Sequence, residues 1–190
     1  MLLLPLMIAP ALAALMWKLM TNPGFGVLSY FASLIGLENF RWASSPDTAL
    51  LTVVLVDIWV YTPFIMILLL AGLRSLPTQP FEAAALDGVP RTFVFFRITL
   101  PMLTPYILTA TLFRLLDSIQ QFDIIYAMTQ GGPGDTLTVF QVEAYLNFFQ
   151  STNVGRSAAL LIILWAITYI LSNVFIKNWL RLRERARGEA

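Results

Sequence analysis

Cysteine and histidine are both absent from the 190 residues of this chain. Their absence excludes disulfides, thiol nucleophiles, imidazole general bases and every zinc site built on either residue. Charged residues are also scarce, at 12%, and the net charge is only +1. Because phosphate binding needs a concentrated basic surface, this balance argues against a nucleic-acid partner.

Apolar residues, by contrast, make up 58% of the chain. So high a fraction with so little charge is typical of a membrane protein. A bilayer core about 30 Å thick needs roughly 20 helical residues. Four stretches meet that need, at residues 2–20, 49–73, 102–121 and 156–177. The sequence therefore predicts an all-α, polytopic membrane helical bundle of about four spanning helices, forming a single domain over residues 1–190.

The first of these stretches has the short apolar run and small residues of a signal peptide. No Lys or Arg precedes the run, although a secretory signal carries a basic n-region. We therefore expect a retained spanning helix over 2–20, kinked or thinned by Pro5 and Pro10.

The distribution of Lys and Arg predicts which loops face the cytoplasm. One side of the predicted bundle carries eight of them: Arg74, Arg91, Arg97, Lys177, Arg181, Arg183, Arg185 and Arg187. The other side carries three: Lys18, Arg41 and Arg156. The excess places the 74–101 loop and both ends of the chain in the cytoplasm, and the 21–48 and 122–155 loops outside.

The outer loop at 122–155 divides into a turn and an amphipathic stretch. Residues 129–136 contain the glycines and proline of consecutive tight turns. After them, Phe140, Ala144 and Phe148 recur at helical spacing, with Glu143 and Asn147 on another face. This pattern predicts a helix lying in the membrane interface, and an ordinary connecting loop is the alternative.

The 74–101 loop contains a short, well-delimited helical pattern. Pro80 suits a first helical position, Glu82 favours the positive end of the helix dipole, and Gly88 ends the pattern. A helix of under three turns does not persist alone in water, so packing on its own chain or on a partner must hold it. The sequence predicts a docking helix over 80–87, although a plain connector lying on the membrane is also compatible with it.

The same loop resembles the EAA loop of permease subunits of binding-protein-dependent ABC importers. Seven fixed positions agree: Glu82, Ala83, Ala84, Gly88, Ile98, Leu100 and Pro101. At average residue usage such a coincidence occurs roughly once in 10⁸. The branch it resembles is that of maltose-type and other sugar permeases, which share Trp59, residues 62–64, Asp87 and residues 129–133.

The resemblance implies a type I ABC importer permease core (MetI-like) in a bacterial plasma (inner) membrane. In that family the loop docks on an ATP-hydrolysing ABC subunit, which implies docking roles for five residues: Glu82, Ala83, Ala84, Asp87 and Gly88. The implied further partners are a second permease subunit, as a heterodimer, and an extracytoplasmic solute-binding protein. Since the chain has no G-x-x-x-x-G-K-[ST] phosphate loop, we expect it to be no enzyme and to bind no cofactor. ATP and Mg²⁺ would be used by the partner.

Family members are longer, six-span or larger subunits, and this chain begins near the middle of their pattern. We therefore expect an N-terminally truncated permease that lacks one or two leading helices.

Ionisable and polar residues inside predicted spans mark a candidate substrate path, because such groups are costly in lipid unless paired or facing water. Arg114, Asp117 and Gln121 fall on one helical face, with Ser118 beside them. Asp57 lies in another predicted span, with Tyr61 one turn further on. These six residues would line a path for a sugar, whereas a self-neutralising pair of Arg114 and Asp117 would only hold helices together.

Two functions from other classes stay open on the residues alone. A secondary transporter would use Asp57, Arg114 and Asp117 as a proton or ion relay and would work without ATP. A membrane scaffold would use the polar face only to bind helices together. Neither explains the seven matching loop positions, so an importer permease for a sugar or related solute is the favoured interpretation.

Overall fold

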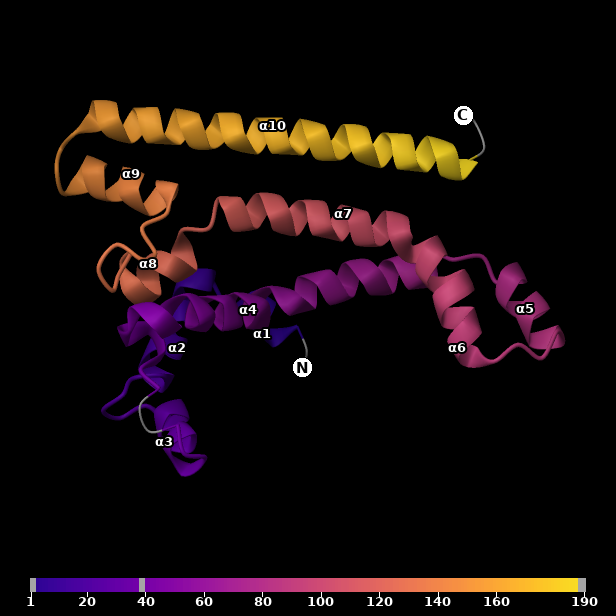
Figure 1. The fold of residues 1–190 in the computed structure, drawn as a ribbon, viewed down its shortest axis with the longest axis horizontal. Helices are drawn as coiled ribbons and strands as arrows, with labels where there is room; N and C mark the ends of the chain where they lie inside the picture. The colour runs from indigo at the N-terminus through magenta and orange to yellow at the C-terminus, as the bar shows by residue number, and fades with distance from the viewer. Residues whose placement is uncertain (1–2, 38–39, 188–190) are drawn as a thin grey trace. The chain divides into compact units, whose positions relative to one another are not determined.

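A computed structural model of the chain describes residues 3–37 and 40–187, and every regular element within them is helical (Figure 1). The all-α prediction is therefore confirmed. The elements are α1 (Leu4–Met7), α2 (Pro10–Met20), α3 (Val27–Leu34), η1 (Trp42–Ser44), α4 (Pro46–Arg74), α5 (Gln79–Leu86), α6 (Arg91–Val94), η2 (Phe95–Thr99), α7 (Leu100–Ile119), α8 (Asp123–Thr129), α9 (Phe140–Phe149) and α10 (Val154–Arg187).

Three helical segments among the described residues are long and apolar enough to cross a membrane: Pro46–Arg74, Arg91–Ile119 and Val154–Lys177. Threonine hydroxyls within them donate to the carbonyl four residues earlier, as Thr52 does to Thr48 and Thr111 does to Ile107. Each hydroxyl is thereby satisfied inside its own helix, which is what an apolar solvent requires.

The expected spanning helix over 2–20 is wrong for the residues the structure describes. The chain leaves the helical conformation at Ile8 and Ala9, whose ψ angles are 135° and 134°, and α2 begins at Pro10. Proline disfavours the helical conformation in the preceding residue and lacks the N–H that would continue the ladder, so it starts a helix better than it extends one. The 11 residues of α2 rise only about 16 Å, roughly half of a bilayer core.

The span expected over 102–121 also has different limits. The helical run begins at Arg91 and passes through the π-helical turn η2 before α7 ends at Ile119. Pro101 lacks the N–H that would bond to the Arg97 carbonyl, which accompanies the irregular turn before it. Gln121 therefore lies beyond the helix, and the expectation that it shares a helical face with Arg114 and Asp117 is wrong.

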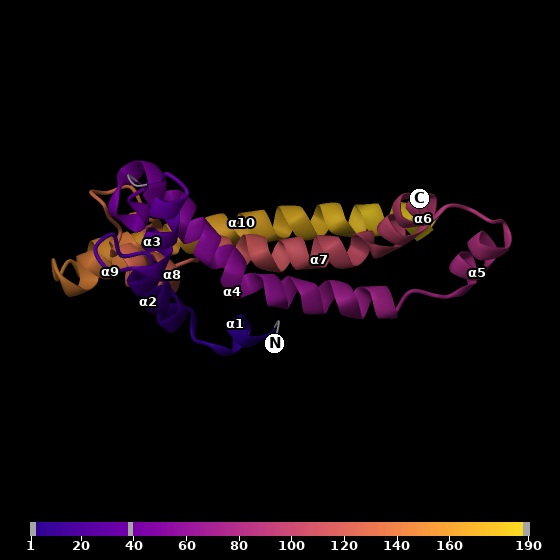
Figure 2. The same cartoon turned by 90° about the horizontal axis from the view of Figure 1, so that it is seen from below.

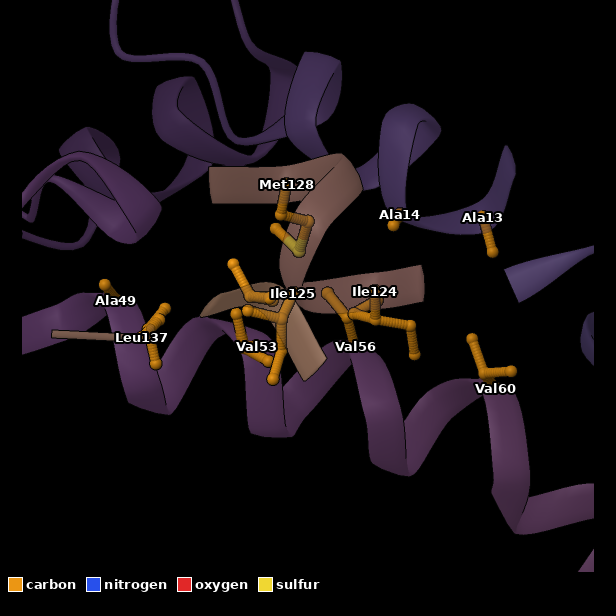
Figure 3. Packing of buried hydrophobic residues seen from close by; sticks show 11 residues of the cluster. Ala13, Ala14, Ala49, Val53, Val56, Val60, Ile124, Ile125, Met128 and Leu137 are labelled. Carbon is orange, nitrogen blue, oxygen red and sulfur yellow. The ribbon is translucent and has the colours of Figure 1, made fainter. Parts of the chain in front are cut away.

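The contacts of the chain group into two compact units, each assembled from segments distant in sequence. The first contains the residues up to Pro63 together with Ile119–Thr168, and the second contains Phe64–Ser118 together with the residues from Tyr169 onward. The expectation of a single domain over 1–190 stays a prediction. The first unit has the main apolar cluster, in which α8 is wedged between α2 and the first half of α4 (Figure 3).

Small and branched side chains make that wedge possible. Ala13 and Ala14 of α2 are fully buried, so their helix approaches α8 closely. Ile124, Ile125 and Met128 fill the space between the helices (Figure 3). The partners on α4 recur at helical spacing: Ala49, Val53, Val56 and Val60.

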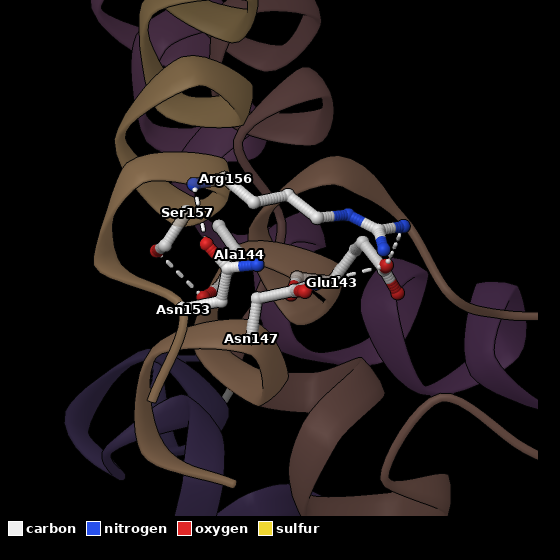
Figure 4. Close-up of polar contacts among 6 residues, drawn as sticks. All are labelled: Glu143, Ala144, Asn147, Asn153, Arg156 and Ser157. Atoms are coloured by element: carbon white, nitrogen blue, oxygen red, sulfur yellow. Dashed lines mark hydrogen bonds and ion pairs between the residues drawn. The ribbon is translucent and has the colours of Figure 1, made fainter. Parts of the chain in front are cut away.

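The amphipathic stretch of the 122–155 loop forms α9, so a helix is confirmed there, and its position in the membrane interface stays a prediction. Asn147, expected on its polar face, is instead 7% exposed, because its amide donates to the Glu143 carbonyl at 2.8 Å and to Glu143 Oε1 at 2.9 Å. Arg156 donates to the same carboxylate at 2.9 Å, and buried Ser157 donates to the Ala144 carbonyl (Figure 4). Side chains of the first turn of α10 thus fasten α9 in place.

Candidate functional site

The helix α5 is the predicted docking helix, and the structure forms it over Gln79–Leu86. It lies at the tip of the loop between α4 and α6, beyond the ends of both (Figures 1 and 2). Pro80 is in its first turn, where a missing N–H costs nothing, and Glu82 faces the positive end of the dipole. The loop is thus built from residues that start and stop a helix within three turns.

Gly88 ends α5 as the sequence predicts. Its φ of +65° is in the left-handed region, which disfavours other residues. The Val89 N–H bonds to the Ala84 carbonyl at 3.1 Å and the Gly88 N–H to the Ala85 carbonyl at 3.3 Å. These two bonds form a Schellman motif, which satisfies carbonyls that a helix end leaves open and turns the chain away sharply.

The side chains of α5 are mostly uncovered. Glu82, Ala83, Ala85 and Asp87 are exposed, and the apolar side chain of Leu86 is 90% exposed. Only Ala84 is buried among the residues of α5, at 6%, so its side chain is covered by its own chain, whereas the side chain of Ala83 is exposed. Leu86 was not among the residues predicted for docking, because a helix this short has too few turns for the spacing of its apolar residues to mark an apolar face.

Two of the six candidate path residues meet directly in the first unit. Gln121 Nε2 donates to Asp57 Oδ1 at 3.2 Å, and both side chains are half-buried. The Asp57 carboxylate therefore has an amide partner at the point where the chain leaves α7. This pair was not foreseen, because Gln121 was placed on a helix that ends two residues earlier.

Trp59 and Tyr61 follow Asp57 on α4 and belong to the same unit. Both pack against the apolar cluster. The ring of Trp59 also contacts that of Trp17 edge to face, with centroids 5.6 Å apart. Packing is thus an observed role for Trp59 and Tyr61, and contact with a solute is a further expectation.

In the second unit, Arg114 and Asp117 form a hydrogen-bonded ion pair one turn apart on α7. The pair anticipated by the sequence is therefore present. Ser118 is exposed at its side. A neighbouring opposite charge lowers the cost of holding either group at membrane depth.

A ladder of aromatic rings follows Gln121 in the outer segment of the first unit. Phe122 and Tyr126 are stacked with centroids 5.1 Å apart, Tyr145 of α9 contacts both, and Phe149 contacts Tyr145. Desolvation, and then a hydrogen bond to Tyr145, raise the pKa of the Tyr126 hydroxyl above its ordinary value, so it stays protonated. These rings are spread over two segments of the sequence, and no single run of residues shows that they meet.

Nothing in the described residues offers a metal centre, since no three acidic side chains converge there. The geometry is that of a multi-pass helical membrane protein with an exposed short helix on one loop and with paired polar groups on or next to its long helices.

Comparison with known proteins identifies the family. The family of "Binding-protein-dependent transport system inner membrane component" matches residues 1–186, and the chain belongs to it. The resemblance found in the EAA loop is thereby confirmed, as is a multi-pass inner-membrane location.

Several relatives of the chain are named as permease proteins of transport systems. The chain is 34% identical to the trehalose/maltose transport system permease protein MalF of Thermococcus litoralis, over 92% of this chain and 59% of that protein. It is 32% identical to the sulfoquinovosyl glycerol transport system permease protein SmoG of Agrobacterium fabrum, over 93% and 57%. It is 34% identical to the sn-glycerol-3-phosphate transport system permease protein UgpA of Pectobacterium atrosepticum, over 85% and 55%. The chain thus spans somewhat over half the length of these relatives.

The fold is also found in a solved structure. A bacterial ABC transporter involved in the import of the acidic polysaccharide alginate has a chain that superimposes with a TM-score of 0.84. The match covers 94% of this chain and 63% of that one, at 24% identity. This likeness concerns the fold, and it agrees with the helical permease core that the sequence predicts.

Proposed function

We propose that the chain is the transmembrane permease subunit of an ATP-driven ABC importer, which moves a sugar or related solute delivered by an extracytoplasmic binding protein. Membership of the binding-protein-dependent family supports this function. The single observation that carries it is α5, a capped helix at the tip of a loop, whose apolar Leu86 is 90% exposed among the described residues. Such a helix is built to be held by another protein.

The partner for α5 is an ATP-hydrolysing subunit in this proposal. The chain has no phosphate loop of its own, so it contains no motif to cradle ATP. Glu82 would meet a basic group of that subunit, Ala83 would allow close approach, and Leu86 would enter an apolar cleft. Asp87 and Gly88 would fix the exit of the chain, and Ala84 would hold the helix to its own loop. A second permease subunit would complete the bundle as a heterodimer.

The orientation in this proposal rests on the excess of Arg and Lys around the 74–101 loop and in the C-terminal part of α10. With three crossings, this excess supports a cytoplasmic position for that loop and for the end of α10, and an outer position for α8 and α9. The further expectation that the N-terminal end is cytoplasmic needed a fourth crossing, which α1 and α2 do not provide as one helix.

The solute in this proposal is an uncharged or weakly charged sugar. Asp57 with Gln121 offers an acceptor and an amide, and Arg114 balances Asp117, so neither group of residues carries a strong net charge. Ser118 adds a hydroxyl, and Tyr61 a ring. The names of relatives point the same way, since they include trehalose, maltose and sulfoquinovosyl glycerol.

The test is ATP-dependent uptake by vesicles that contain the chain, its second permease, the ATPase and the binding protein. Glu82→Lys and Gly88→Pro should each abolish uptake and co-purification of the ATPase. Proline cannot adopt the φ of +65° found at Gly88. Asp135→Lys on the outer loop is the matched charge control and should bind the ATPase normally. Uptake that continues without ATP would instead support a secondary transporter, and survival of both loop variants would refute docking at α5.

The solute path is tested separately with labelled maltose, trehalose and sn-glycerol-3-phosphate as probes. Asp57→Ala should raise the concentration for half-maximal uptake of the accepted probe at least tenfold, because the Gln121 amide loses its acceptor. Asp47→Asn, at an exposed acid in the first turn of the same helix, should change nothing. Equal behaviour of the two variants would remove Asp57 from the path.

A further inference from the structure

Next to the 74–101 loop, the two long helices on either side of it, α4 and α7, make a close contact. Gly72, in the last turn of α4, is buried against the side chain of Tyr106 on α7. A Cβ atom built on Gly72 would lie 2.6 Å from Tyr106 Cγ and 2.9 Å from its Cβ. The Cβ atom of Tyr106 is fixed to the backbone of α7 and does not move when the side chain rotates, so a side chain at position 72 would push the two helices apart.

The hydroxyl of the same tyrosine bonds to the end of α4. Ser75 Oγ donates to the Gly72 carbonyl at 2.8 Å, and Ser75 Oγ and Tyr106 Oη share a further hydrogen bond. A serine hydroxyl has one hydrogen, so in this arrangement Tyr106 donates to Ser75. The Gly72 carbonyl also accepts the Ser75 N–H at 3.1 Å, so the backbone and the side chain of Ser75 both bond to it at the end of α4. The Tyr106 hydroxyl therefore adds a contact from another helix to the residue that holds the end of α4.

A second contact fixes the direction of the same pair of helices. Phe64 of α4 meets Phe113 of α7 edge to face, with centroids 6.3 Å apart. Position 64 faces 113 and position 72 faces 106, so the helices run antiparallel. The Tyr106 contact is the one nearer the loop, which leaves α4 directly at Ser75.

We propose that Tyr106 is a positioning residue for coupling, which joins the ends of α4 and α7 so that a displacement of α5 reaches both helices together. This inference rests on the proposed importer function. Without the Tyr106 contact, a displacement of the loop would reach α4 and α7 separately. Less solute would then be taken up for each ATP hydrolysed.

The experiment measures solute taken up per ATP hydrolysed in the reconstituted importer, with labelled maltose as the first probe. Tyr106→Phe keeps the ring and removes only the hydrogen bond to Ser75, and it should lower the ratio about fivefold, the factor that corresponds to one net hydrogen bond. Gly72→Ala should lower it further. Gly72→Ala combined with Tyr106→Ala should recover part of the loss, because removal of the ring makes room for the methyl group.

Two matched controls should leave the ratio unchanged. Tyr30→Phe removes an exposed tyrosine hydroxyl from the outer α3, and Gly155→Ala adds a methyl where the nearest atom lies 4.0 Å away. If Gly72→Ala fails to assemble, Tyr106→Phe decides alone. A normal ratio for Tyr106→Phe would overturn the positioning role while leaving the importer intact, whereas a wild-type chain without any ATP-dependent uptake would overturn the importer itself.

Discussion

Two short helices of nearly equal length, α8 and α5, differ in how far their side chains are buried. The 7-residue α8 buries Ile124, Ile125 and Met128 in the cluster it shares with α2 and α4. The 8-residue α5 buries only Ala84 and leaves Leu86 exposed. Neither is long enough to be stable alone. The difference shows that α8 is held by its own chain, whereas α5 keeps an exposed apolar side chain, as the proposed docking on another protein requires.

The largest expected effect is on the buried side of this comparison. Ile124→Ala should lower the free energy of unfolding by about 2–5 kcal/mol, because it empties a fully buried site between three helices. Reversible unfolding of the purified chain in mixed micelles measures the change. Ile162→Ala, at an exposed position on α10, is the control and should stay within about 0.5 kcal/mol of wild type. Equal losses for the two would mean that α8 is not packed as described.

The contacts that hold α9 on α10 should give a smaller effect. Asn147→Ala removes a buried amide that bonds to both the carbonyl and the carboxylate of Glu143, and it should cost about 1–2 kcal/mol. Asn173→Ala removes an amide that bonds only to the Tyr169 carbonyl and should cost less. The same unfolding measurement compares them. A larger loss at Asn173 would show that the Glu143 contacts do not stabilise the outer segment.

The smallest effect on stability is expected at α5. Leu86→Ala removes a side chain with no cover, so the free energy of unfolding of the chain alone should change by less than about 0.5 kcal/mol. The affinity for the ATPase subunit should nevertheless fall, as measured by titration of the subunit onto the chain. If Leu86→Ala lowered the free energy of unfolding as much as Ile124→Ala does, the statement that α5 is exposed and α8 is buried would be contradicted.

The exposed short helix α5 could be predicted from the sequence, whereas the buried short helix α8 could not. The proline, glutamate, alanines and glycine of the loop lie within one short segment, and each acts locally, so the limits of α5 and the role of Gly88 followed from residue chemistry. The long apolar runs of α4 and α10 were recognisable for the same reason. Pro10 also acted locally, but it interrupted the first helix rather than bending it, whereas Pro5 lies in the first turn of α1.

The remaining features depend on residues far apart in the chain. The pairing of Asp57 with Gln121, the aromatic ladder and the Tyr106 contact at Gly72 each join segments separated by 19 or more positions. Spacing along one helix does not report such contacts. Gln121 was expected on a helical face, but α7 ends at Ile119. Gln121 therefore lies beyond the helix, where its side chain reaches Asp57 on α4.

The most direct measurement of docking at α5 is the accessibility of position 86. The chain has no cysteine, so Leu86→Cys and Ser151→Cys each introduce one labelling site, on α5 and on the exposed outer loop. A water-soluble maleimide should label both rapidly in the purified chain. Addition of the ATPase subunit should slow labelling at position 86 at least tenfold and leave position 151 unchanged. Unchanged labelling at position 86, with the ATPase bound, would contradict α5 as the docking helix.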